Sequence, residues 1–372
     1  MKKGRRKESQ FGKQEKKAIE MDIEKILLEK KEIIDKTIEK YLPRKFDERN
    51  IKNFVKLNSV DTFACTNGIA EPIWELLDRG GKRWRPTLFL IIVEALGGNV
   101  EKLKDFCIVP ELIHNGTLIV DDVEDSSELR RGKPCIHKIF GIDIAINAGN
   151  SLYFLPLIVF IKNRDKVKKE NLLRAYEIYI EEMINVSFGQ AIDIVWHRGL
   201  KKDEEIKEEE YLIMCALKTG TLARMSARLA ATLCGADENL VEKLGKFAES
   251  LGIAFQIQDD ILDVTAPESI GKVYGNDIKE GKRTLMVIHT LKNASKEDRE
   301  RLIEILNKHT DDMKEREEAI RILEKYGAID YAKKVAQEIV EKAWKDVEKL
   351  IPESEAKKKL RSFAYYMIER KR

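Results

Sequence analysis

The sequence predicts an all-α fold, a large single-domain helical bundle, and three observations lead to it. The chain has 372 residues, 43% hydrophobic and 36% charged, which is typical of a globular protein with a sizeable core. Pro 8 and Gly 21 are too few for the many turns of a β fold. Apolar residues recur at intervals of three and four through nearly the whole chain, which is the period of amphipathic helices.

The chain begins with a basic segment whose composition differs from the rest. Its first 17 residues contain eight Lys or Arg, and they lack the apolar core of a signal peptide. We expect residues 1–20 to form a solvated, disordered tail, with an anchor for nucleic acid or a lipid surface as the alternative. The helical domain is expected over residues 21–372.

Helical segments are expected one after another from residue 21, and Pro and Gly separate them. The predicted breaks are Pro43, GGKRWRP at 80–86, GG at 97–98, RRGKP at 130–134, Gly235 and TAPESIGKVYGND at 265–277. Two segments, ELIHNGTLIV at 111–120 and ESLGIAFQIQ at 249–258, are apolar around most of the helix. We therefore expect both in the middle of the bundle, around a central cavity.

Cysteine spacing and hydropathy indicate the compartment. The five cysteines form no C-x-x-C pair and have no His at zinc spacing, so we expect reduced thiols in a cytoplasmic protein. No run of 18 apolar residues occurs, which argues against an integral membrane segment. The net charge of +3 gives no reason to expect a nucleic-acid partner.

A first acidic cluster closes the apolar segment at 111–120. Asp121, Asp122 and Asp125 have the spacing i, i+1, i+4, which gathers three carboxylates on one side of the last helical turn. Like charges repel there, and a helix C-terminus is unfavourable for anions, so a positive partner is needed. Carboxylate oxygens suit Mg²⁺, which substrate phosphates complete. A solvated acidic turn is the alternative for one such cluster.

The same spacing returns at the end of the second apolar segment. Asp259, Asp260 and Asp263 again follow at i, i+1, i+4. If the two helices face each other, the carboxylates converge on one cavity mouth. Such a mouth would repel an anionic substrate unless Mg²⁺ ions bridged the carboxylate and phosphate oxygens. The repetition therefore favours a metal–diphosphate site.

Basic side chains that suit phosphate lie near both clusters. They are Lys82 and Arg85 in GGKRWRP, Arg130 and Arg131 after the first cluster, Lys272 and Lys282 after the second, and Lys218, which with Thr219 interrupts a helix in ALKTGTLAR. Each alone reads as a surface charge, but together they bracket the two acidic clusters. His114, two turns before Asp121, is either a buried core histidine or a ligand of diphosphate.

These motifs resemble those of the trans-type polyprenyl diphosphate synthases. The resemblance covers GGKRWRP, ELIHN, DDVEDSSELRRGKP, KTG at 218–220, FQIQDDILD and GKVYGNDIKEGKRT, in that order from Gly80 to Thr284. It implies a prenyltransferase of isoprenoid biosynthesis that joins isopentenyl diphosphate head to tail to an allylic diphosphate. It also implies an α-helical homodimer and Mg²⁺, about three ions per active site.

The resemblance also assigns residues. It implies that Asp121, Asp122, Asp125, Asp259, Asp260 and Asp263 hold Mg²⁺ and are catalytic together with Lys218, Thr219 and Gln256. It implies that the allylic diphosphate is bound by Arg130, Lys218, Gln256, Lys272 and Lys282. The diphosphate of isopentenyl diphosphate is assigned to Lys82, Arg85, His114 and Arg131.

Product length is expected to depend on bulk beside the helix that ends at Asp121. Farnesyl-type members carry large aromatics at the two positions occupied here by Gly116 and Thr117, so the sequence favours a longer, geranylgeranyl (C20) product. The candidate residues for the floor of the tunnel are Ile113, Leu112, Val109, Tyr153 and Phe154. Farnesyl products and chains of C25 and above are the alternatives.

Other classes of protein with related motifs fit this sequence less well. A non-catalytic subunit of a prenyl synthase usually lacks an aspartate in one cluster, but both clusters are complete here. Terpene cyclases and head-to-head synthases need no isopentenyl site of the GGKRWRP kind. The prediction is therefore an active chain-elongating synthase.

Overall fold

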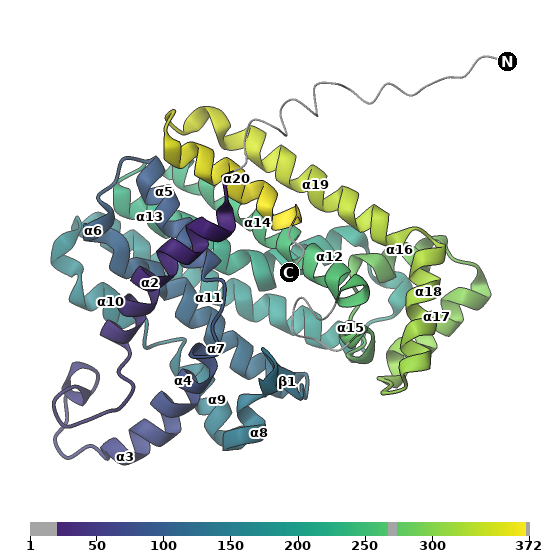
Figure 1. Cartoon of the computed structure of the whole chain (residues 1–372), viewed down its shortest axis with the longest axis horizontal. Helices are drawn as coiled ribbons and strands as arrows, with labels where there is room; N and C mark the ends of the chain where they lie inside the picture. Colours follow the sequence, from purple (N-terminus) through teal and green to yellow (C-terminus); the bar gives the residue numbers. More distant parts are fainter. Residues whose placement is uncertain (1–20, 267–273, 370–372) are drawn as a thin grey trace.

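The structure, a computed structural model, describes residues 21–266 and 274–369. It confirms the all-α prediction, since helices pack side by side through the described part of the chain (Figure 1). The first half comprises α2 (Ile23–Tyr41), η1 (Ile51–Asn53), α3 (Thr62–Cys65), η2 (Thr66–Ala70), α4 (Glu71–Leu77), α5 (Trp84–Ala95), α6 (Val100–Leu103), η3 (Lys104–Cys107), α7 (Ile108–Glu124), α8 (Ile136–Phe140), α9 (Ile142–Ser151), α10 (Leu157–Lys162), η4 (Arg164–Lys166) and α11 (Lys169–His197).

The second half continues the bundle. It comprises η5 (Asp203–Glu205), α12 (Glu208–Cys215), η6 (Ala216–Gly220), α13 (Thr221–Cys234), α14 (Glu238–Thr265), α15 (Asn276–Lys279), α16 (Leu285–Asn293), α17 (Lys296–Lys308), α18 (Met313–Lys325), α19 (Ala328–Val347), η8 (Glu348–Leu350) and α20 (Glu355–Glu369). Nearly every residue of α13 is buried, and α13 packs against α5, α7, α11 and α14. This helix is therefore at the centre, while α19 and α20 lie along one outer edge (Figure 1).

Helix ends agree with local sequence signals. Asp237 begins α14 by accepting a hydrogen bond from the backbone N–H of Leu240 at 2.9 Å. Gly235 ends α13 in the left-handed conformation, with φ of 82°, which glycine adopts without strain. The predicted breaks at Pro43, 80–83 and 97–98 all lie between helices. The segment 267–273 in the last predicted break lies outside the described residues.

The break at RRGKP is a hairpin that was not predicted as strands. β1 (Leu129–Arg130) pairs antiparallel with β2 (Lys133–Pro134), and Arg130 lies opposite Lys133. The two turn residues, Arg131 and Gly132, have φ of 54° and 75°, as a tight two-residue hairpin turn requires. The hairpin directly follows α7, so it returns the two arginines toward the end of that helix.

No helix within residues 21–266 and 274–369 is both long enough and apolar enough to cross a bilayer. The basic tail at residues 1–20 lies outside the described residues.

Candidate active site

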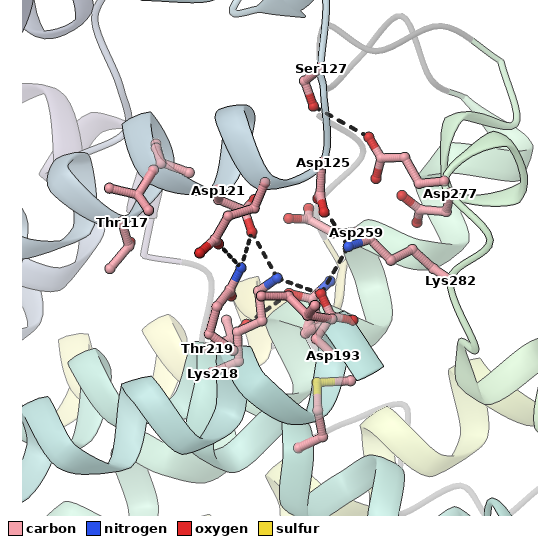
Figure 2. A pocket seen from close by; sticks show the side chains of 18 of the residues that line it. Thr117, Asp121, Asp125, Ser127, Asp193, Lys218, Thr219, Asp259, Asp277 and Lys282 are labelled. Carbon is pink, nitrogen blue, oxygen red and sulfur yellow. Dashed lines mark hydrogen bonds and ion pairs between the residues drawn. The ribbon is translucent and has the colours of Figure 1, made fainter. Parts of the chain in front are cut away.

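A single large cavity of about 760 Å³ lies among α7, α11, α13 and α14 in the described part of the chain. Both acidic clusters reach it, because Asp121 and Asp125 line one side while Asp259 and Asp260 line another. Figure 2 shows the side chains of Lys218 and Lys282 pointing toward Asp121 and Asp125. The structure thus brings together the ends of two helices that lie more than a hundred residues apart in sequence.

Two lysines and Asp193 connect the cavity walls. Lys218 Nζ lies 3.0 Å from Asp121 Oδ1 and 2.6 Å from Asp193 Oδ2. Lys282 Nζ lies 2.9 Å from Asp125 Oδ2 and 2.8 Å from the same Asp193 oxygen (Figure 2). The first acidic cluster is therefore paired with cations that α7 itself does not provide.

The remaining aspartates of each trio have structural partners. Asp122 is buried and accepts a hydrogen bond from Arg130 Nε at 2.9 Å, so it orients that arginine. Asp263 is fully buried and accepts from the backbone N–H of Asp277 at 3.0 Å. Neither carboxylate lines the cavity, although sequence analysis assigned both to metal.

A chain of hydrogen bonds fixes the second cluster. Thr219 Oγ1 donates to Gln256 Oε1 at 2.8 Å, and Gln256 Nε2 donates to Asp260 Oδ1 at 2.8 Å. Tyr211 Oη donates to the other oxygen of Asp260, also at 2.8 Å. Thr219 and Gln256 are thus part of the machinery that orients Asp260.

Burial and charge set the ionisation of the acidic side. Burial acts to raise the pKa of Asp121, but Lys218, Lys282 and Arg130 outweigh it and hold that pKa well below its ordinary value. Burial and the neighbouring Asp121 raise the pKa of Asp125 to about 7, although Lys282 opposes them. The lysines therefore neutralise only part of the negative charge.

The acidic side fits a divalent cation. Asp125 Oδ1, on the cavity wall, is buried without a hydrogen-bond partner among the described residues. Hard carboxylate oxygens are the ligands that Mg²⁺ prefers. No three acidic, imidazole or thiol groups of residues 21–266 and 274–369 are grouped closely enough to enclose a metal alone. Mg²⁺ takes one or two carboxylates from a protein and completes its shell with water and phosphate.

Positive charge accumulates on another part of the cavity wall, around Arg85. Arg85 lines the cavity, its guanidinium stacks 4.4 Å from the Trp84 ring, and its Nε lacks a hydrogen-bond partner among the described residues. Burial lowers the pKa of Arg85 to about 10 and Arg131 adds to the effect, although Glu111 opposes them. Burial, followed by Arg85 and Arg131, holds the pKa of His114 well below its usual range, so His114 is neutral at pH 7.

The other predicted basic residues lie near this side or outside the described chain. Arg131 donates to the backbone oxygen of Leu76 at 3.3 Å and to Asn115 Oδ1 at 3.4 Å, and it does not line the cavity. Lys82 is half-buried in the segment before α5, next to Arg83. Lys272 lies outside the described residues. Arg85 and His114 are the predicted isopentenyl-site residues that line the cavity.

Two cavity residues were missed by sequence analysis. Gln190 donates to Asp121 Oδ1 at 2.8 Å and to Glu124 Oε2 at 2.6 Å, and Asp193 holds both lysines. The signal for them was available, because GQAIDIVWH places two polar residues one turn apart in an otherwise apolar stretch.

The residues predicted to control product length have different environments. Thr117 and Tyr153 line the cavity, together with Met183 and Val186 of α11. Gly116 instead packs against α9, where an added Cβ would lie 2.7 Å from Gly149 O and 2.8 Å from Leu152 Cβ. Val109, Leu112 and Ile113 are in the hydrophobic core, and the Phe154 side chain is 69% exposed.

Comparison with known proteins identifies related sequences and structures. A model of the polyprenyl synthetase family matches residues 66–323. A short chain isoprenyl diphosphate synthase from Methanothermobacter thermautotrophicus is 38% identical over 296 residues, which cover 79% of this chain and 88% of that relative. A geranylgeranyl pyrophosphate synthase from Geoglobus acetivorans is 35% identical over 294 residues, with the same two coverages of 79% and 88%.

A solved structure shares the fold. The geranylgeranyl pyrophosphate synthetase from Pyrococcus horikoshii superimposes with a TM-score of 0.80 at 31% identity, over 94% of this chain and 99% of that chain. The predicted isoprenoid-synthase type of helical bundle is therefore confirmed.

Proposed function

Because the chain belongs to the polyprenyl synthetase family, we propose that it joins isopentenyl diphosphate head to tail to an allylic diphosphate, with geranylgeranyl diphosphate as the main product. One observation carries the proposal: a single cavity has a partly neutralised acidic side with Asp121 and Asp125, and a basic side with Arg85. Two diphosphates can bind there in different ways, one through metal and one directly.

The allylic diphosphate is assigned to the acidic side. Asp121, Asp125, Asp259 and Asp260 would hold Mg²⁺, about three ions per site, and the ions would supply positive charge to the departing diphosphate. Lys218 and Lys282 now pair with Asp121 and Asp125, and they would turn to the diphosphate oxygens when metal takes over those aspartates. Arg130, which Asp122 orients, lines the cavity beside Asp121 and would bind the same diphosphate. Gln256 and Lys272 complete the assignment carried over from the family motifs.

Isopentenyl diphosphate is assigned to the basic side. Arg85 offers a buried guanidinium with an unpaired N–H, and Lys82 and Arg131 lie on the adjoining segments. His114 is neutral and surrounded by arginines, so it can donate one hydrogen bond to a phosphate oxygen without adding charge. Burial is the main cause of the lowered pKa values of Arg85 and Arg131, and neighbouring arginines add to it, so a diphosphate would supply the negative charge that favours both charged forms.

The reaction then needs no nucleophilic side chain. The allylic carbon–oxygen bond breaks and its electron pair leaves with diphosphate. The isopentenyl double bond attacks the resulting cation, and the released diphosphate takes the proton lost from the new carbon chain. Water must be kept away from the cation, and Leu118, Val186 and Phe255 provide apolar walls to the cavity.

The small side chain at position 117 supports a product longer than farnesyl. Thr117, one turn before Asp121, lines the cavity and leaves room beside that aspartate. On α11, Met183 lies two turns before Gln190 and also lines the cavity. We assign the floor to Met183 and Tyr153, with Tyr153 retained from the sequence-based candidates.

We also propose a cytoplasmic homodimer. The five cysteines are all free thiols, as expected in a reducing compartment. Helix α11 exposes Ile180, Ile184 and Phe188, by 57%, 53% and 64%, in a row with a spacing of four residues. An exposed apolar row of this kind is typical of a protein interface.

The test is a product analysis. The protein is incubated with Mg²⁺, labelled isopentenyl diphosphate and, separately, dimethylallyl, geranyl and farnesyl diphosphate, and the products are sized after dephosphorylation. We expect incorporation that chelation of the metal abolishes, with C20 alcohol as the main product. Absence of incorporation with every primer would reject the activity, and a main product of another length would reject only the C20 assignment.

A further inference from the structure

The turn that carries Lys218 and Thr219 is wound differently from the helices on either side. Residues Ala216–Gly220 form a π-helical turn, η6, between α12 and α13. A π-turn holds an extra residue, so it bulges from the helix axis. Here the bulge brings Lys218 Nζ within 3.0 Å of Asp121 and places Thr219 Oγ1 at 2.8 Å from Gln256.

A glycine on α11 allows the turn to reach the cavity. A Cβ added to Gly189 would lie 2.6 Å from the carbonyl carbon of Leu217 and 2.8 Å from Lys218 Cα. Both contacts are closer than side-chain carbons come to backbone atoms, and backbone cannot rotate away as a flexible side chain can. The backbone of η6 therefore lies directly on the missing side chain of Gly189.

A second glycine supports the opposite side of the turn. A Cβ added to Gly252 of α14 would lie 2.6 Å from Gly220 Cα and 3.2 Å from Thr219 O. Inside the turn, the fully buried Thr221 donates its hydroxyl to Leu217 O at 2.6 Å. The turn is thus seated between two helices at points where neither helix has a side chain.

We propose that Gly189 and Gly252 are positioning residues that set how far Lys218 and Thr219 project into the cavity. Neither glycine lines the cavity, and the atoms nearest to an added Cβ at each position are backbone atoms of η6. The proposal rests on the proposed role of Lys218 in binding the allylic diphosphate. It adds that the spacing of α11 and α14 around η6, not the lysine alone, determines that binding.

The test is Gly189→Ala, with Gly68→Ala as the matched control. Gly68 also lies in a π-turn, η2, but an added Cβ there has nothing within 4 Å. Gly189→Ala must displace η6 by about 1 Å, so we expect about a 100-fold loss of kcat/KM for the allylic diphosphate. Gly68→Ala should keep the wild-type value.

A double-mutant cycle separates positioning from a general effect on the fold. In a background that carries both Lys218→Ala and Thr219→Ala, we expect Gly189→Ala to cost less than about threefold, because both side chains that it misplaces are already absent. Equal losses in both backgrounds, or full activity of Gly189→Ala, would overturn the proposal. Wild-type protein without any transferase activity would instead reject the proposed function.

Structure determination provides a readout that does not depend on turnover. In crystals of Gly189→Ala or Gly252→Ala, Lys218 Nζ should leave the hydrogen bonds to Asp121 and Asp193. An unmoved Lys218 in either variant would contradict the proposal. If both alanine variants fail to fold while Gly68→Ala folds, the glycines serve the fold as a whole and the positioning role is rejected.

Discussion

Arg130 and Arg131 are neighbours in the chain, yet their side chains have different partners. Arg130 pairs with Asp122, whereas Arg131 donates to the backbone oxygen of Leu76 and to Asn115. Arg131 and Gly132 form the hairpin turn with positive φ of 54° and 75°, and the chain reverses there. Under the proposed function, this turn would give the two positive charges to different diphosphates.

The metal assignment predicts a loss of turnover without a loss of fold. Asp121→Ala or Asp259→Ala should lower kcat by about 100- to 1000-fold, because each removes charge that acts as diphosphate departs. Circular dichroism should remain that of the wild type. The exposed Glu300→Ala on α17 is the control, and near wild-type kcat in both aspartate variants would contradict the assignment.

The isopentenyl assignment predicts an effect on one substrate only. Arg85→Lys keeps the charge but loses the planar fork, so KM for isopentenyl diphosphate should rise about tenfold or more. KM for the allylic substrate should stay the same. Arg44→Lys is a matched control, because Arg44 also stacks on a tryptophan, 3.9 Å from the Trp74 ring, but at the surface. Equal changes in both KM values would refute the division of the cavity.

Thr117 and Gly116 should respond differently to the same substitution. Thr117→Phe adds bulk to the cavity wall, so the main product should shorten by at least one five-carbon unit. Gly116→Phe should instead lower the melting temperature, because its Cβ would overlap Gly149 and Leu152. Sizing of the dephosphorylated products and thermal unfolding measure the two outcomes. An unchanged product from Thr117→Phe would show that the chain grows elsewhere.

At the scale of elements, periodicity was sufficient to predict the helices but not their detailed winding. The two acidic helices, now α7 and α14, were predicted with their breaks because apolar residues recur at helical spacing. The convergence of Asp121 and Asp259 followed only on the condition that these helices face each other. Sequence spacing carries no information on such long-range pairing, which depends on packing.

Other features could not be predicted from local sequence. KTG was expected to interrupt a helix, but it forms a π-turn whose backbone packs against Gly189 and Gly252, which lie on other helices. Gly116 was expected to open a tunnel, whereas it allows α7 to pack on α9. A glycine in a helix signals close approach without saying what approaches, and tertiary contacts decide between a cavity and a neighbour.

One buried carboxylate, that of Asp105, binds the last two residues of helix α2. Asp105 is 2% exposed and accepts hydrogen bonds from Lys40 at 2.6 Å and from Tyr41 at 2.7 Å. Asp105→Asn should lower the free energy of unfolding by about 1–3 kcal/mol at pH 7, since it leaves Lys40 without its charged partner. Urea denaturation of both proteins measures the difference.

The pH dependence of that difference has a definite sign. Burial acts to raise the pKa of Asp105, but the hydrogen bonds from Lys40 and Tyr41 outweigh it and the folded-state pKa is lowered. The stabilisation is therefore present above the unfolded pKa, near 3.9, and is lost as pH falls through the folded value. The gap between the wild type and Asp105→Asn should close below about pH 4, and a gap that widens there would contradict the ion pair.

At the scale of the whole molecule, the two faces of α11 have different environments. Its inner face contributes Met183, Gln190 and Asp193 to the cavity, while Ile184 and Phe188 are exposed on the outside. A second copy of the chain packed on the outer face would therefore restrain the helix that holds Lys218 and Lys282 through Asp193. Dimerisation and catalysis would then be coupled through one rigid element.

The proposed dimer interface can be tested by introducing charges into the exposed apolar row of α11. Ile184→Glu together with Phe188→Glu should convert the dimer to monomer in analytical ultracentrifugation, because burying two carboxylates without partners is unfavourable. Leu28→Glu, which replaces a 71% exposed leucine on α2, should leave the dimer intact. A dimer that persists in the double variant would locate the interface elsewhere.

The ion pairs of Asp121 and Asp125 with Lys218 and Lys282 have a consequence for the order of binding. Divalent ions arriving alone must compete with ammonium groups for the same oxygens, and diphosphate arriving alone must compete with carboxylates for the same nitrogens. When both arrive, each releases the groups that the other needs, so either ligand raises the affinity for its companion by an equal factor. The site would then respond to the metal–substrate complex as one ligand and would stay partly neutralised by its own lysines until that complex arrives.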